Sequence, residues 1–243
     1  MAQCCYDEDA LIAYDFEDAA PLSAYFDNII GSVANTASAG INSTRGARSS
    51  SQFDEFSRTY TLHVDDCGNG RRAFGIGGYW KVDSTSNNFY IMEVRDTNLG
   101  GQTVYSIYQD GVNLVIYNGT GSDELYRVSN VFVVGTFRKI EVRGSVSSYN
   151  EDTIESGNDG FLEVRINKRV YKNGDDFAAI DPTSPPESCE AGVSGIITGR
   201  VVSGWNRIVF YPHGDLDCIY IKESATYCND RELGTPGDRK SVV

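Results

Sequence analysis

Apolar and polar residues alternate with a period of two along much of the chain. In the segment FLEVRIN, Leu162, Val164 and Ile166 fall on one side, and polar residues fall on the other. This is the pattern of a strand with one buried face. In RKIEVRG the same reading places Ile140 and Val142 inward. Such runs predict strands at 11–17, 58–64, 72–82, 88–95, 103–109, 112–117, 125–134, 138–144, 161–167, 205–211 and 215–224.

Turn signals separate these strands, and helix signals are few. Asp110-Gly111 lies between two apolar runs, which is a strong signal for a hairpin. Pro21 to Gly40 is Ala-rich enough for a turn or two of helix, but no segment keeps a 3.6-residue apolar period. Residues 145–159 and 173–191 read as long loops. The order predicts a single all-β domain, an antiparallel β-sandwich of about a dozen strands.

The charge balance excludes several classes of partner. The 243 residues include 34 Asp and Glu against 21 Lys and Arg, so the net charge is -13. Nucleic acid binding needs clustered Lys and Arg, so we expect no nucleic-acid partner. No segment reaches the roughly 18 apolar residues of a membrane span, which predicts no membrane insertion. The six scattered cysteines form no CxxC motif and favour free thiols over disulfides, unless the protein meets an oxidising medium.

The order of several degenerate motifs resembles a concanavalin A-like, laminin-G-type jelly roll. The first predicted strand carries the acidic and aromatic run Tyr14-Asp15-Phe16-Glu17. The pair VVGTFRKIEVRG and FLEVRINKRVY is similar to a consecutive strand pair of that family, with Phe137 in the usual Trp place and Asn167-Lys168 in the usual Asp-Gly place. The closing strand carries Asp217-Cys218 where the family has two aspartates. The resemblance covers roughly residues 11–224 and implies a jelly roll there.

The segment after the closing strand resembles proteins of tailed bacteriophages. It reads Tyr-Cys-Asn-Asp-Arg-Glu-Leu-Gly over 227–234. The resemblance implies a non-enzymatic structural protein of a virion, made in the host cytoplasm, that decorates the head or the tail exterior. Its expected partners are other virion proteins and further copies of itself in a homo-oligomer. Residues 1–10 and 225–243 lack strand patterning, and we expect them to be N-terminal and C-terminal docking arms.

Catalytic motifs are weak in this sequence, which predicts that the protein is not an enzyme. Glu151 to Glu155 is the nearest approach to paired glycosidase carboxylates, but it lies in a polar loop. Neither His63 nor His213 belongs to a catalytic motif, and no Gly-x-Ser-x-Gly nucleophile elbow occurs. A polysaccharide depolymerase is therefore the weakest of the functional alternatives.

Calcium is the one cofactor that the acidic residues suggest, because related jelly rolls can hold a structural ion between the first and last strands. Carboxylate clusters suit Ca²⁺. The alternative is that acids near turns serve only solvation. The candidate ligands lie near the two ends of the predicted domain: Asp15, Glu17, Asp18, Asp215 and Asp217.

A carbohydrate-binding adhesin that recognises a host glycan is the main functional alternative. It would use exposed aromatic rings that stack on sugar rings. Strand aromatics also fill sandwich cores, so the pattern leaves both roles open. Trp80 and Trp205 are the candidate glycan-binding residues, and the other available aromatics are Tyr79, Tyr105, Tyr108 and Tyr117.

Overall fold

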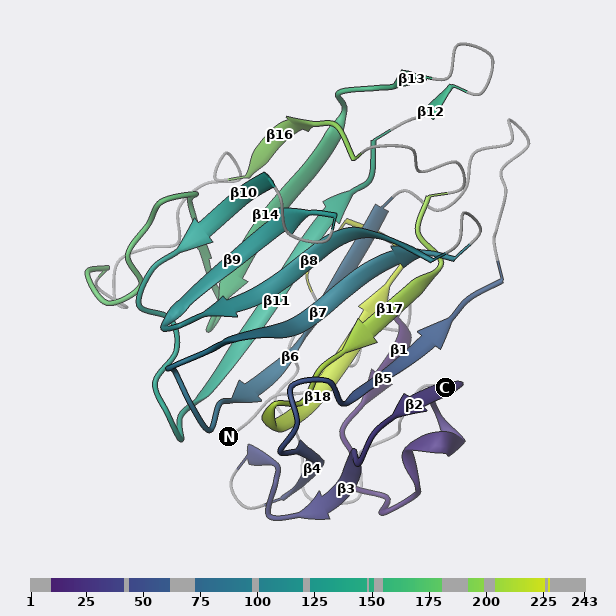
Figure 1. Cartoon of the computed structure of the whole chain (residues 1–243), viewed down its shortest axis with the longest axis vertical. Helices are drawn as coiled ribbons and strands as arrows, with labels where there is room; N and C mark the ends of the chain where they lie inside the picture. Colours follow the sequence, from purple (N-terminus) through teal and green to yellow (C-terminus); the bar gives the residue numbers. More distant parts are fainter. Residues whose placement is uncertain are drawn as a thin grey trace.

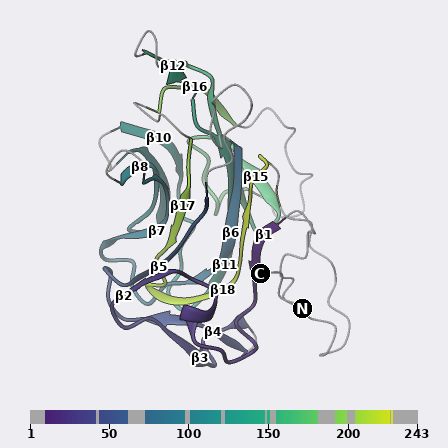
Figure 2. The same ribbon diagram turned by 90° about the vertical axis from the view of Figure 1, so that its right-hand side faces the viewer.

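The protein is a β-sandwich whose two sheets face each other across one apolar core (Figures 1 and 2). Every pairing between the strands that the structure describes is antiparallel, which confirms the predicted all-β class. Within the described residues the helical structure is one 3-10 turn at Leu22–Ala24, where the sequence predicted a turn or two. The computed structural model describes residues 10–41, 44–61, 73–97, 101–119, 123–147, 149–150, 155–180, 192–198, 204–225 and 227.

The first sheet has nine strands. β1 pairs with β18 beside β4, and β16 pairs with β14. The remaining strands follow one path across the sheet. In order they are β15 (Arg169–Tyr171), β14 (Gly160–Ile166), β11 (Phe137–Ser145), β6 (Ala73–Lys81), β18 (Gly214–Lys222), β4 (Arg45–Ser49) and β3 (Ala34–Ala37), with β1 at Ala10–Tyr14 and β16 at Val193–Ile196.

The second sheet has seven strands and lies against the first, as the side view in Figure 2 shows. A separate short ribbon pairs β12 (Tyr149–Asn150) with β13 (Glu155–Ser156) inside the predicted loop 145–159. The seven strands run in the order β10 (Asp123–Val128), β9 (Asn113–Asn118), β8 (Gln102–Asp110), β7 (Asn88–Asp96), β17 (Arg207–Phe210), β5 (Glu55–Thr59) and β2 (Asn28–Ile30).

The core follows from the alternation in the sequence. Ile140 and Val142 of β11 and Leu162 of β14 are buried there, as their spacing predicts. Side chains from one sheet also bond to the other. The Tyr105 hydroxyl of β8 donates to the carbonyl of Ser145 in β11 at 2.9 Å. Apolar burial and these cross-sheet bonds together fix the spacing of the two layers.

Ile219 and Ile221 of β18 are in the core, and a bulge interrupts the alternation of this strand just before them. Its register against β6 shifts between Asp217 and Tyr220, and Cys218 has a φ of 50°. The extra residue lets Leu216 and Ile219, three positions apart, both reach the core. Cys218 is also disulfide-bonded, whereas the sequence favoured free thiols. The positions of cysteines in a sequence do not show which pairs lie close enough in the fold to form a disulfide. The other five cysteines lie outside the described residues.

Two further differences separate the observed strands from the predicted ones. β2, β3 and β4 occupy a region in which the sequence showed no clear alternation. β2 pairs with β5, and β4 pairs with β18 and β3, so partner strands supply hydrogen bonds that the local sequence does not predict. The strand predicted at 125–134 ends at Val128, because Asn130 adopts a φ of 57° that turns the chain. None of the described segments is a helix long and apolar enough to cross a membrane.

Candidate functional site

The outer face of the nine-stranded sheet carries a layer of paired, buried charges. β11 and β14 each contain Glu-Val-Arg, and their antiparallel register places Glu141 opposite Arg165 and Arg143 opposite Glu163. Arg165 donates to both carboxylate oxygens of Glu141 at 2.6 Å. Arg143 donates to both oxygens of Glu163 at 2.8 and 2.9 Å. Both glutamates have an exposed fraction of 0%, so these carboxylates are not available to a ligand.

Tyr227 lies over this layer. Its ring centroid is 4.2 Å from the guanidinium carbon of Arg165 and 4.9 Å from that of Arg143, which is cation-π geometry. Burial raises the pKa of the Tyr227 hydroxyl, and the nearby Glu163 carboxylate raises it further. Arg143 also donates to the Ala225 carbonyl at 3.5 Å. The beginning of the predicted C-terminal arm therefore packs on the sandwich itself.

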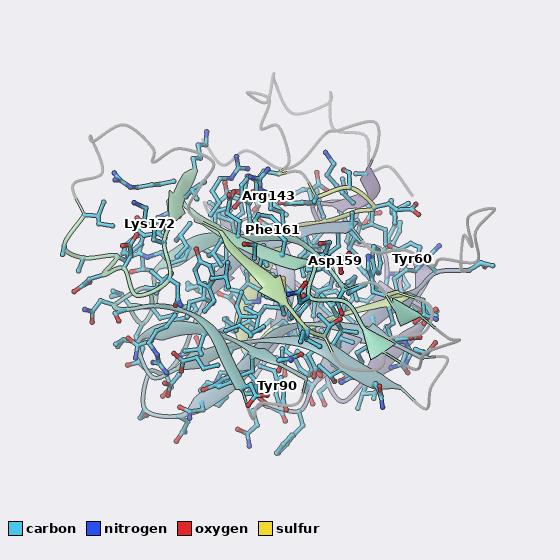
Figure 3. The ribbon with its side chains drawn as sticks, turned by 90° about the horizontal axis from the view of Figure 1, so that it is seen from above. Tyr60, Tyr90, Arg143, Asp159, Phe161 and Lys172 are labelled. Carbon is cyan, nitrogen blue, oxygen red and sulfur yellow. The ribbon has the colours of Figure 1, made fainter. Side chains whose placement is uncertain are left out.

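The outer face of the seven-stranded sheet carries a row of tyrosines instead. Figure 3 shows Tyr90 and Arg143 on opposite sides of the molecule. From β17 to β9, the ring centroids of neighbouring tyrosines are 5.2, 4.1 and 5.5 Å apart. All but the first ring are partly exposed. We call this set the tyrosine row: Tyr211, Tyr90, Tyr108 and Tyr117.

The tyrosine row arises from strand register. Tyr90 of β7 is paired with Tyr108 of β8, and Tyr117 of β9 is diagonal to Tyr108. Each of these residues alternates with a core residue on its own strand, for example Ile107 beside Tyr108 and Ile116 beside Tyr117. Cross-strand aromatic neighbours on one face interact favourably. The row is therefore a continuous aromatic surface across four segments of the chain.

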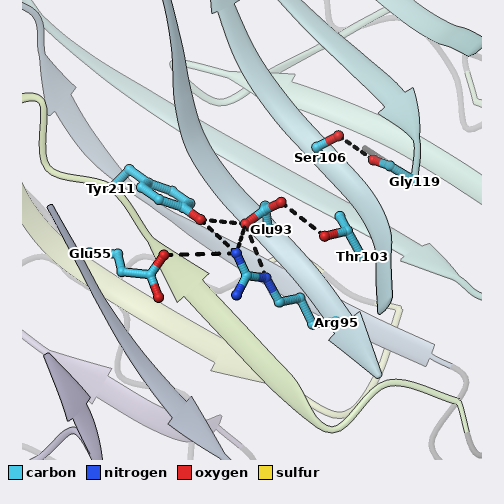
Figure 4. A network of polar contacts seen from close by, with 7 residues as sticks. All are labelled: Glu55, Glu93, Arg95, Thr103, Ser106, Gly119 and Tyr211. Atoms are coloured by element: carbon cyan, nitrogen blue, oxygen red, sulfur yellow. Dashed lines mark hydrogen bonds and ion pairs between the residues drawn. The ribbon is translucent and has the colours of Figure 1, made fainter. Parts of the chain in front are cut away.

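A polar cluster adjoins the tyrosine row (Figure 4). Arg95 bonds to Glu93 through Nε at 3.1 Å and through Nη2, and Nη2 also donates to the Tyr211 hydroxyl at 2.9 Å. The Thr103 hydroxyl donates to Glu93 Oε1 at 3.0 Å. Glu55 lies 3.8 Å from Arg95 Nη2. We call Glu55, Glu93, Arg95, Thr103 and Tyr211 the polar cluster.

Protonation in the polar cluster follows from its burial and charge. Burial raises the pKa of the Tyr211 hydroxyl, and Glu93 raises it further. Burial alone would lower the pKa of Arg95, but the Glu93 carboxylate reverses that effect and the net direction is upward. Tyr211 therefore stays a hydrogen-bond donor to Glu93 at neutral pH, and Arg95 stays a cation.

The structure places both predicted glycan-binding tryptophans in the core. Trp80 has an exposed fraction of 2% and Trp205 of 0%. Trp80 points inward from β6, and the Trp205 indole donates to the Ala73 carbonyl at 2.9 Å. Neither ring offers a face to a sugar, so we correct the prediction for these two residues. Their large apolar area is worth more inside the sandwich than on its surface.

The five predicted calcium ligands do not converge on one ion. Asp215 pairs with Lys81 and, at 3.4 Å, with Arg48. Asp18 accepts hydrogen bonds from the hydroxyls of Tyr14 and Tyr25.

Asp217 lies near Asp15 and Glu17, whose carboxylates raise its pKa, but these three predicted ligands form no metal site either. Asp217 accepts the backbone N–H groups of Ile41 at 3.0 Å and Cys218 at 2.7 Å. Asp15 accepts the N–H of Glu17 within its own turn. Among the described residues, no group of three or more Asp, Glu, His or Cys side chains is placed to hold a metal ion. The arrangement does not offer the six to eight oxygens that Ca²⁺ takes.

The buried carboxyl group of Asp217 is expected to make the stability of the protein depend on pH. Burial raises its pKa from 3.8 to about 7, and the Glu17 and Asp15 carboxylates add to the shift. Between about pH 4 and 7 the folded state holds a proton that the unfolded state has released. We therefore expect the free energy of unfolding to fall as pH rises through this window, and Asp217→Asn to weaken that dependence.

Urea unfolding at pH 4, 5.5 and 7 measures the effect. Asp176→Asn is the control, because Asn130 lowers the pKa of the partly exposed Asp176, which places its titration below the window. An unchanged slope in Asp217→Asn would contradict the assignment.

Several other sequence-level candidates have a structural role or lie outside the described residues. His213 stacks on Phe89 with ring centroids 3.7 Å apart, and burial lowers its pKa. His63 and residues 151–154 lie outside the described residues, as do 1–9 and 228–243 of the predicted arms.

The sequence identified only part of the candidate site. Tyr108 and Tyr117 were among the aromatic residues that it predicted to be available for binding, but nothing in it indicated Tyr90, Tyr211 or Glu93. The usable signal was the position of each tyrosine beside a core residue, such as Ile107 before Tyr108 and Ile116 before Tyr117. Joining the four rings requires the strand order, which local alternation does not contain.

No protein-family model and no curated protein sequence matches the chain. Several solved structures share its general architecture. The alginate lyase vAL-1 from Chlorella virus is 10% identical, with a TM-score of 0.43 over 88% of this chain and 97% of that chain. The binding domain of botulinum neurotoxin DC, in complex with SialylT, is 11% identical, with a TM-score of 0.47 over 90% of this chain and 49% of that chain.

A third similar structure is the CBM40 domain of the Ruminococcus gnavus IT-sialidase, bound to alpha2,3 sialyllactose. It is 9% identical, with a TM-score of 0.38 over 64% of this chain and 77% of that chain. At these identities and TM-scores, the likenesses carry no information on function.

Proposed function

We propose that this protein binds carbohydrate on the outer face of its seven-stranded sheet. The observation that carries the proposal is the tyrosine row, whose rings form a continuous surface from the residue after β17 across β7, β8 and β9. The C–H face of a sugar ring is apolar and packs on an aromatic face, while its hydroxyls need polar partners. Tyr108 and Tyr117 are partly exposed and supply the first requirement.

The polar cluster supplies the second requirement. The Arg95 side chain is 23% exposed and has further N–H donors for a sugar hydroxyl. Thr103 is partly exposed beside it and is fixed by its bond to Glu93. Because these groups are held by one another before any ligand arrives, binding does not require them to become ordered.

We expect binding without cleavage. Both carboxylate oxygens of Glu93 already accept hydrogen bonds, one from Thr103 and the other from Arg95 and Tyr211. A lyase would need a tyrosine or histidine that gives up its proton, but the raised pKa of Tyr211 opposes this. Release of reducing ends or of unsaturated sugars from a bound polysaccharide would contradict this part of the proposal.

Tyr108→Ala is expected to weaken glycan binding roughly tenfold to a hundredfold, because it removes the central ring of the tyrosine row. A glycan array identifies a bound oligosaccharide, and isothermal titration then gives its dissociation constant for each variant. Near-ultraviolet circular dichroism checks that the variant remains folded.

Tyr79→Ala is the matched control. Tyr79 belongs to β6 and lies on the outer face of the other sheet, so its removal is expected to leave binding unchanged. Equal losses in both variants would indicate a general effect on the fold. An array with no bound glycan would overturn the proposed function.

A role as a virion component is the second candidate, and it is supported by the sequence resemblance to phage jelly-roll proteins. The two roles are compatible, because a protein on a particle exterior can also bind a host glycan. Co-purification with particles at a fixed stoichiometry would support this role. Absence from purified particles would remove it and leave the glycan-binding proposal intact.

A further inference from the structure

Two arginines lie directly opposite each other at the edge of the polar cluster. The register of β17 against β7 pairs Arg207 with Arg95, and the inward neighbours Ile208 and Val94 place both arginines on the outer face. Like charges at directly opposed positions destabilise a sheet. This arrangement is notable in a chain with a net charge of -13, where an acidic residue would be the ordinary neighbour of an arginine.

The two acids of the polar cluster contact only one of the two arginines. Glu93 and Glu55 both pair with Arg95. Arg207 has no acidic partner among the residues that the structure describes, and its cross-strand neighbour on β5 is Thr59. The two carboxylates balance the charge of the two arginines, but neither of them contacts the Arg207 guanidinium.

The Arg207 guanidinium is held in place but keeps most of its donors. Its Nε donates to the Thr59 hydroxyl at 2.8 Å. Neither Nη atom bonds to any described residue, and the side chain is partly exposed. Nη1 of Arg95 is likewise unused within the described part of the chain. A guanidinium oriented in this way fits the two oxygens of a carboxylate or sulfate group.

We propose that the glycan bound at this face is acidic, and that Arg207, assisted by Arg95, binds its carboxylate or sulfate group. This inference rests on the proposed carbohydrate binding. The Arg95 guanidinium bonds to the Tyr211 hydroxyl at one end of the tyrosine row, and Tyr90 is the next ring of that row. The ligand is thus an oligosaccharide whose acid group lies close to the sugar ring stacked on the tyrosine row.

The test is a glycan array in which each uronate-, sialate- or sulfate-bearing oligosaccharide is printed beside its neutral parent. Wild-type protein is expected to prefer the acidic member of a pair, and the preferred pairs distinguish carboxylate from sulfate. Arg207→Gln is expected to weaken binding of the acidic glycan roughly tenfold to a hundredfold and to leave the neutral parent unchanged. Its unfolding midpoint should not fall, because the substitution relieves repulsion with Arg95.

Arg127→Gln is the matched control. Arg127 is on β10 of the same sheet and already pairs with Asp110 and Glu124, so its loss should change glycan binding less than twofold. Equal binding of acidic and neutral members, with Arg207→Gln unaffected, would overturn the inference while the proposed function stands. Binding of acidic glycans that Arg127→Gln weakens as much as Arg207→Gln does would also overturn it. An array with no bound glycan would remove the proposed function itself.

Discussion

Glu141→Gln is expected to lower the free energy of unfolding by about 3–5 kcal/mol, because it leaves buried cations without a partner. Glu141 has an exposed fraction of 0% and accepts both bonds of Arg165. Lys139, 3.2 Å away, pairs with the same carboxylate, and the Tyr220 hydroxyl donates to it at 3.1 Å. Glutamine keeps the shape but removes the charge. Urea unfolding at pH 7 measures the loss.

Two further variants distinguish the effect of removing a buried charge from a general loss of stability on substitution in the sheets. Glu124→Gln breaks the pair with Arg127, whose side chains are 38% and 30% exposed, and should cost at most about 1 kcal/mol. The double variant Glu141→Leu with Arg165→Met removes both members of a buried pair and should recover part of the loss. Similar losses for Glu141→Gln and Glu124→Gln would show that the layer is not the buried network described above.

Trp205→Ala is expected to lower the free energy of unfolding by about 3–5 kcal/mol, since it empties a large volume in the core. The indole has an exposed fraction of 0%, contacts the Tyr60 ring edge-on at a centroid distance of 6.0 Å, and donates to the Ala73 carbonyl. The substitution also leaves that carbonyl without its partner. Chemical unfolding followed by tryptophan-independent circular dichroism gives the magnitude.

The same variant distinguishes a core residue from a glycan contact. Trp205→Phe keeps most of the packing and should lose less stability than Trp205→Ala. At a temperature where both variants are folded, we expect their glycan affinity to equal that of the wild type. A loss of affinity with unchanged stability would instead restore Trp205 to the binding surface.

The sequence predicted the strands more successfully than the site because the two depend on different information. The alternation in FLEVRIN is a local signal, and β14 buries Leu162, Val164 and Ile166 as that signal requires. Trp80 occupies an equally inward position of β6. Its nomination for glycan binding came from residue type, whereas its exposure depends on which face of β6 meets the second sheet.

The acidic residues also show the difference between what a local pattern predicts and what the tertiary structure decides. The acidity of the chain suggested one cluster formed by Asp15 to Asp18 with Asp215 and Asp217, since both groups lie near the ends of the domain. The β18 bulge and the pairing of Asp215 with Lys81 and Arg48 assign these acids to separate partners. A local pattern places an acid on a strand, but partners from distant segments decide what it bonds to.

The sequence by itself determined the β class and the inward set of most strands, because a period of two leaves one solution for burying apolar residues. Only the tertiary structure decided which outer face carries paired charges and which carries the tyrosine row. That choice depends on register between strands far apart in the chain, such as Arg207 against Arg95 and Tyr90 against Tyr108. Register is a property of pairs of strands, and no single segment of the sequence contains it.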